Sequence, residues 1–118
     1  MNDKIAWGEC WHDTLLERIT IDYDNIVVEI EVNEKITKLI CYNFIGFDYL
    51  GQWDENVIKC ITLSEDDEMI FVAKERIKYN NSLGGGVKKF ETQWKCVCIE
   101  LIDGVIIHII CEKVDYNN

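Results

Sequence analysis

The chain has 118 residues, the length of one ordinary domain, enough to bury roughly two-thirds of the surface that its unfolded form exposes. Hydrophobic residues make up 48% and charged residues 29%, a balance that excludes an intrinsically disordered chain. The formal net charge of −10 at pH 7 argues against nucleic acid or anionic lipid as partners and favours fast association with basic partners. Such a charge also keeps a protein soluble, so composition alone does not choose between these explanations.

The N-terminal residues 1–8 contain no apolar run of signal-peptide length, and no segment of the chain is apolar enough to cross a membrane. We therefore expect a cytoplasmic protein that does not bind membranes. Its six cysteines are then expected to be reduced thiols rather than disulfides. No internal repeat or change of composition marks a boundary, so residues 1–118 are predicted to form a single domain.

Three strands of alternating polarity are predicted in the N-terminal third, where they form a meander of residues 15–23, 26–32 and 35–45. Pairing across a turn at residues 24–25 places Ile21 opposite Val28, so that apolar side chains share one face of the sheet. A second turn then places Glu29 opposite Lys38 as a cross-strand charge pair.

The middle of the chain begins with an aromatic loop or bulged strand over residues 46–55. A fourth strand is predicted for residues 56–63. Residues 64–79 favour a helix, because Ser64 can cap it and acidic side chains precede basic ones. Its apolar stripe consists of Met69, Val72, Ala73 and Ile77. A strand over residues 69–73 remains an alternative, because this run also has β character.

The C-terminal residues 94–113 predict a β-hairpin folded about Asp103 and Gly104, since Asp-Gly between apolar runs is typical of a two-residue turn. This register places Cys96 opposite Cys111 in the hairpin. Both faces of the hairpin are largely apolar, so we expect it in the middle of a sheet.

Together these elements predict an α+β fold, dominated by an antiparallel sheet of about six strands. The sheet is expected to be curved or partly closed, with one helix packed on it.

Metal and cofactor sites are not predicted. The three glycines at residues 84–86 lack a strand-to-helix context for phosphate binding and suggest a flexible loop. Cys96 and Cys98 alternate within a strand, whereas structural zinc sites take their thiolates from turns. The predicted register pairs His108 with Ile99, on the face away from both thiols. We therefore expect no metal and no cofactor.

His12 is the possible site histidine of this chain. It precedes Asp13, but neighbours in an extended segment point to opposite sides and do not form a base with its orienting group. An enzyme using His12 with a cysteine or carboxylate is the weakest of three functional hypotheses, so the protein is expected to be non-enzymatic. Acid–base chemistry by Asp48, Asp54 or Glu55 has no specific support in the sequence.

The segment of residues 11–19, which begins Trp-His-Asp, resembles the start of small bacterial proteins with an aromatic-His-Asp motif. Some of those proteins are immunity proteins of polymorphic toxin systems. Residues 51–55 (Gly-Gln-Trp-Asp-Glu) and 101–104 (Leu-Ile-Asp-Gly) look like signatures of the same kind of family. The resemblance implies a cytosolic α+β protein without catalysis.

An acidic inhibitor of a basic toxin would gain steered association from charge complementarity. Aromatic side chains beside carboxylates suit such an interface, and the predicted partner-binding residues are Asp48, Tyr49, Trp53, Asp54 and Glu55. The leading hypothesis is therefore an immunity-like module that binds a basic protein. The alternative from another class is a small-molecule-binding protein with a pocket under residues 44–53.

Overall fold

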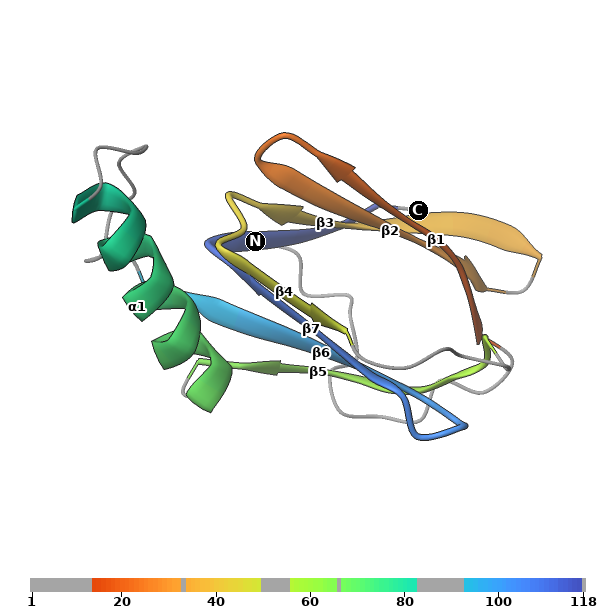
Figure 1. Cartoon of the computed structure of the whole chain (residues 1–118). Coiled ribbons are helices and arrows are strands. Elements are labelled where there is room, and N and C mark those ends of the chain that lie inside the picture. The colour runs from red at the N-terminus through yellow and green to blue at the C-terminus, as the bar shows by residue number, and fades with distance from the viewer. Residues whose placement is uncertain (1–13, 33, 50–55, 66, 83–92, 118) are drawn as a thin grey trace.

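The computed structural model describes residues 14–32, 34–49, 56–65, 67–82 and 93–117, and the statements below concern these residues (Figure 1). Their elements in chain order are β1 (Thr14–Asp22), β2 (Asn25–Val32), β3 (Lys35–Tyr42), β4 (Gly46–Tyr49), β5 (Ile58–Ser64), α1 (Glu68–Ser82), β6 (Lys95–Leu101), β7 (Ile106–Cys111) and β8 (Lys113–Asn117).

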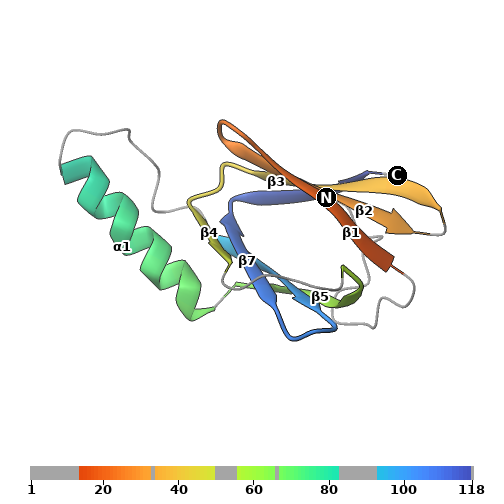
Figure 2. The same cartoon turned by 45° about the vertical axis from the view of Figure 1, so that its right-hand side comes forward.

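The strands form two antiparallel sheets instead of the single sheet that was expected. One sheet has the order β1-β2-β3-β8 and the other has the order β4-β7-β6-β5. The two sheets lie as layers facing each other, and α1 lies at one end of the second layer (Figures 1 and 2), where it packs against Cys96 and Ile110. The α+β class and the antiparallel pairing are confirmed. The estimate of six strands was too low, since eight are described, and the sheets are not closed.

The meander forms as predicted, but only one of its two registers was correct. Glu29 lies opposite Lys38, as expected. Ile21, however, pairs with Ile26 rather than with Val28. The turn lies one residue earlier than predicted because Tyr23 adopts a positive φ of 56°, and this moves the pairing by two residues. A shift by two keeps each side chain on its predicted face, so the apolar face was still identified correctly.

The C-terminal hairpin is also present, and β6 and β7 occupy the middle of their sheet as predicted. Its register differs by one residue, because the turn has three residues rather than two. The amide of Gly104 donates to the carbonyl of Leu101 at 3.0 Å, and the amide of Leu101 donates to the carbonyl of Val105 at 2.9 Å. Gly104 has a φ of 95°, which fits a tight turn followed by a bulge.

This one-residue shift changes which side chains are neighbours. Cys96 pairs with Ile110, so the predicted opposition of Cys96 and Cys111 is wrong. His108 pairs with Cys98 instead of Ile99, and so it lies on the same face as that thiol.

A bent ribbon connects the two sheets. Strand β3 pairs with β8 in the first sheet, and the following strand β4 pairs with β7 in the second. Tyr42 pairs with Lys113 on one side of the bend, and Gly46 pairs with Ile110 on the other. Between these two pairs, the segment that joins β3 to β4 has three residues, whereas the segment that joins β7 to β8 has two. One extra residue therefore marks a bulge at the bend, where Asn43 has a φ of 52°.

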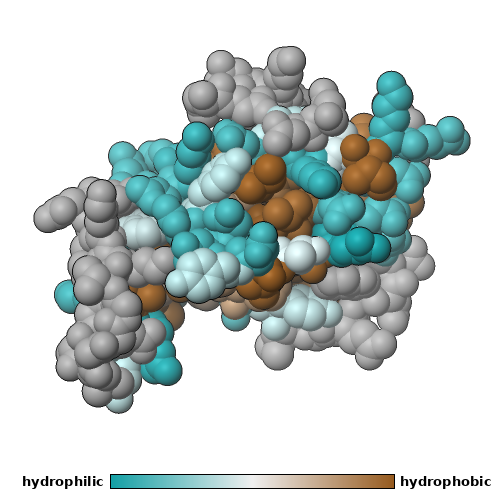
Figure 3. All heavy atoms as spheres, turned by 90° about the horizontal axis from the view of Figure 1, so that it is seen from above, coloured by the Kyte–Doolittle hydropathy of each residue, from teal (hydrophilic) through white to brown (hydrophobic). Residues whose placement is uncertain are grey.

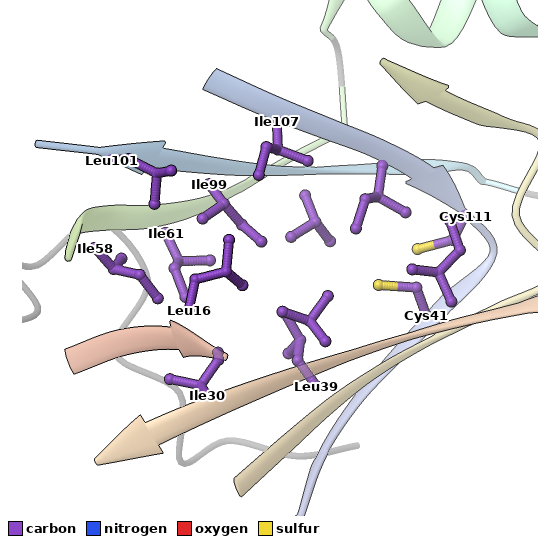
Figure 4. Close-up of a cluster of buried hydrophobic side chains, with 14 residues drawn as sticks. Leu16, Ile30, Leu39, Cys41, Ile58, Ile61, Ile99, Leu101, Ile107 and Cys111 are labelled. Atoms are coloured by element: carbon purple, nitrogen blue, oxygen red, sulfur yellow. The ribbon is translucent and has the colours of Figure 1, made fainter. Parts of the chain in front are cut away.

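The main core lies between the inner faces of the two sheets (Figure 4). Among the described residues, fourteen buried side chains form it, including Val28 and Leu39 from the first sheet and Ile99 and Ile107 from the second. A second contact joins the layers at their other side, where the Leu16 amide donates to the Asn56 carbonyl at 2.7 Å. Apolar burial from both layers thus supplies the main stabilising term of the fold.

Residues 68–82 are helical, so the helix prediction is confirmed and the strand alternative is wrong. Asp67, rather than Ser64, caps the helix, because its carboxylate accepts the Met69 amide at 2.8 Å. The buried stripe includes Ile70 and Ala73, whereas Val72 is 52% exposed, contrary to prediction. None of the described helices is long and apolar enough to cross a membrane.

A substitution at Gly104 tests the three-residue turn. Gly104→Ala should lower the free energy of unfolding by about 1–2 kcal/mol, because an alanine is strained at a φ of 95°. A new Cβ would meet no atom within 4 Å, so the loss would report the backbone alone. Urea unfolding measures the change, and Gly104→Asn is the control that should lose less, since Asn tolerates positive φ. Equal stability of both variants and the wild type would contradict this turn.

Candidate functional site

Of the five predicted partner-binding residues, Asp48 and Tyr49 are described, and they point to opposite faces of β4. Asp48 lies opposite His108 on the outer face, and Tyr49 lies opposite Ile107 and packs against the core. Whether these residues bind a partner stays a prediction. Trp53, Asp54 and Glu55, like the possible site histidine His12, lie outside the described residues.

A row of polar side chains crosses the outer face of the β4-β7-β6-β5 sheet beside α1. The register places Asp48, His108, Cys98 and Thr62 in adjacent positions on the four strands. His108 Nδ1 lies 3.5 Å from Asp48 Oδ2 and is buried without a hydrogen bond in the described part of the chain. The order of carboxylate, imidazole and thiol has the residue types of a nucleophilic triad.

The electrostatics of this row do not favour a thiolate. Burial raises the pKa of the Cys98 thiol above its usual value, and a hydrogen bond with Thr62 lowers it only in part. The thiolate is the reactive form of cysteine, and a raised pKa favours the protonated thiol of Cys98 at neutral pH. The row therefore has the composition of a triad without its activation.

Metal binding has no support among the described residues, which contain no group of three or more histidine, cysteine or carboxylate side chains suited to an ion. Near the row, Cys60 Sγ donates to Glu100 Oε1 at 3.6 Å, and Lys59 Nζ lies 3.6 Å from Glu100 Oε2. These side chains thus have partners within the protein.

An open hollow of about 620 Å³ lies where the bent ribbon passes between the sheets. It is lined by Tyr42, Asn43, Gln93, Lys95, Glu112 and Lys113. Its position differs from the pocket that was predicted under residues 44–53. That predicted pocket remains a prediction, since residues 50–53 lie outside the described part of the chain.

The outer face of the β1-β2-β3-β8 sheet carries a cluster of three glutamates, Glu17, Glu31 and Glu34. Glu17 lies beside Glu31 because β1 has a bulge between Leu16 and Arg18. A hydrogen bond with Glu17 is the main cause that raises the pKa of Glu31, and repulsion from Glu17 and Glu34 adds to it. No salt bridge among the described residues involves Glu17, Glu31 or Glu34, so no basic side chain there offsets the repulsion between them.

Apolar side chains lie on the same face as this acidic cluster. Val27 pairs directly with Ile40, and Ile36, which is 47% exposed, pairs with Glu31. Seen from above, apolar residues gather in the middle of the molecule with hydrophilic residues on either side (Figure 3). We name these six residues (Glu17, Val27, Glu31, Glu34, Ile36 and Ile40) the acidic-apolar face.

Sequence reasoning missed both the polar row and the acidic-apolar face. The row was missed because a one-residue error in the hairpin register moved His108 to the wrong side of the sheet. The acidic-apolar face carried a usable signal, since Val27, Glu29 and Glu31 alternate with buried residues of β2 and must therefore share its outer side.

The rate at which the Cys98 thiol is alkylated tests how far Thr62 favours its thiolate form. Thr62→Val removes the hydrogen bond that lowers the pKa of Cys98, so iodoacetamide should modify this thiol roughly threefold to tenfold more slowly at pH 8. Mass spectrometry of the peptide containing Cys98 measures the rate. Thr20→Val, an exposed change on β1, is the control and should leave it unchanged. Faster alkylation of the Thr62 variant would show that the hydroxyl does not stabilise the thiolate.

The acidic cluster predicts an unusual dependence of stability on pH. The folded state raises the pKa of Glu31, so its contribution to stability is present below the usual pKa and is lost as pH rises through the folded value. Glu17→Gln should therefore raise the urea midpoint at pH 7 and change it less near pH 4.5. Glu75→Gln, which removes the partner of Lys78 on α1, should not raise the midpoint at pH 7. A lower midpoint for Glu17→Gln at pH 7 would contradict the proposed repulsion.

Comparison with known proteins adds no relative, since no protein-family model, no curated protein and no solved structure matches this chain.

Proposed function

We propose that this protein is a non-enzymatic binding module whose acidic-apolar face binds a basic protein. The observation that carries the proposal is the crowding of Glu17, Glu31 and Glu34, which raises the pKa of Glu31 in the unbound protein. A surface that keeps like charges together has an unfavourable interaction that a cationic partner can remove.

An arginine of the partner is the most suitable counter-charge for this cluster. Its planar guanidinium can donate to two carboxylate oxygens at once, and it remains charged throughout the physiological pH range. A guanidinium beside Glu17 and Glu31 would replace their repulsion with two attractive contacts. The net charge of −10 would in addition steer the partner towards the protein before contact.

The apolar part of the face would supply the tightly packed contact. Val27 and Ile40 are partly buried and lie side by side across β2 and β3. Next to them, Arg18 and Glu29 already neutralise each other at 3.8 Å, which lowers the cost of removing water from this area. An apolar centre beside a charged cluster is typical of protein interfaces, where a few central residues provide most of the affinity.

The resemblance of residues 11–19 to immunity proteins of polymorphic toxin systems suggests which partner this would be. We propose a bacterial toxin with a basic surface, neutralised in the cytoplasm by occlusion. Many such targets are enzymes that act on nucleic acid, and these need basic clefts for the same electrostatic reason. An acidic inhibitor would compete for that cleft with the phosphate backbone.

The test uses a basic protein encoded beside this chain, co-expressed with it in bacterial cells and then purified for binding. Wild-type protein should restore growth of cells that express the partner. Glu17→Gln combined with Glu31→Gln should lower the association rate several-fold at low salt, with a smaller effect at high salt. Val27→Ser combined with Ile40→Ser should weaken binding about tenfold, mainly through faster dissociation.

The matched control changes two exposed glutamates of α1, Glu68→Gln and Glu75→Gln, which alter the net charge by the same amount at a distant place. If the control slows association as much as the change of Glu17 and Glu31 does, the net charge of the whole protein determines the association rate. The acidic-apolar face is then not the binding site. Undiminished binding by both face variants would remove the proposal.

A further inference from the structure

Two thiols from different sheets meet on the inner side of the bent ribbon. Cys41 belongs to β3 and Cys111 is the last residue of β7, and both side chains are fully buried in the core. A hydrogen bond joins the two thiols. Their sulfur atoms lie side by side and both point into the core (Figure 4).

The backbone fixes this approach independently of the thiols. The amide of Glu112 donates to the carbonyl of Tyr42 at 2.9 Å. The residues that directly follow the two cysteines are therefore hydrogen-bonded to each other. The side-chain amide of Asn43 also donates to Glu112 Oε1 at 2.8 Å. These two bonds hold the segments that carry the cysteines next to each other, so the thiols share the inner side of the bend.

The other described cysteines have different surroundings. Cys96 lies on the outer face under α1, packed with Trp94 and Ile110, and burial raises its pKa to about 12. Cys98 forms a hydrogen bond with Thr62, and Cys60 forms a hydrogen bond with Glu100. The geometry therefore singles out one pair.

We propose that Cys41 and Cys111 form a disulfide that locks the two sheets together, with a two-electron oxidant such as hydrogen peroxide as co-reactant. Two S–H bonds break and one S–S bond forms. The two electrons reduce the O–O bond of the peroxide, which takes up both protons and leaves as two molecules of water.

Opening of β8 controls the rate of this reaction. Both thiols are buried, and the hydrogen bond with Cys111 raises the pKa of Cys41, so the closed protein reacts slowly. Among the described strands, β8 lies at the edge of its sheet and pairs with β3 alone, and Val114 of β8 lies directly opposite Cys41. Local separation of such an edge strand needs less energy than global unfolding, and it would expose the pair. Closure then protects the disulfide from reductants by the same burial.

The experiment exposes reduced full-length protein to hydrogen peroxide, with and without a urea concentration below the unfolding transition. Intact-mass spectrometry should show a loss of about 2 Da, and fragment spectra should assign the bond to Cys41 and Cys111. Formation should be at least several-fold faster in urea. The oxidised protein should melt about 10 °C higher than the reduced protein, because the bond closes a loop of about 70 residues.

Cys111→Ala should lose both the mass change and the rise in melting temperature. Cys96→Ala is the matched control, since it removes an equally buried thiol from the same sheet and should keep both. The wild-type fragment spectra decide the question even if a variant does not fold. A bond between other cysteines, persistence of free Cys41 in urea, or an unchanged melting temperature after oxidation would each overturn the proposal.

Discussion

The bend in the ribbon of β3-β4 and β7-β8 is the constraint on which the rest of the structure depends. The paired β3 and β8 of one sheet continue as the paired β4 and β7 of the other sheet. One residue is inserted on the β3-β4 side of this ribbon, near Asn43. This insertion turns the apolar faces of the two sheets towards each other, so that fourteen buried residues can form one core. Without the bend, the same alternating strands would form one extended sheet with a large exposed apolar face.

Burial of the inner faces leaves two outer faces with different surroundings. On the β4-β7-β6-β5 sheet, α1 covers part of the outer face and leaves a polar row beside it, where burial raises the pKa of the Cys98 thiol. The β1-β2-β3-β8 sheet has its acidic-apolar face where no described helix packs. The second face thus combines unrelieved charge with apolar contact area, and this combination is the physical basis of the proposed binding role.

Alternation along the strands was sufficient to predict the fold class, the meander and the central place of the terminal hairpin. It was insufficient where one residue matters. A positive φ at Tyr23 and a three-residue turn ending at Gly104 each moved a register, because turn length rather than polarity sets the pairing.

The bend between the sheets could not be predicted for a related reason. β7 is mostly apolar, and β8 alternates polar and apolar residues, but both are extended, so polarity does not show that the chain passes from one sheet into another. For the site, nearness in sequence did not indicate that Asp48 and Tyr49 lie on opposite faces of β4.

The order of strands has a consequence for synthesis of the chain. β7 is an interior strand of one sheet, and β8 completes the edge of the other, so both sheets depend on residues that are synthesised well after the meander. Until then the nascent meander exposes the apolar inner side of Val28 and Leu39 with nothing to cover it. Closure must therefore be a late event that joins distant parts of the chain, a topology associated with slow folding and with a need for protection against aggregation.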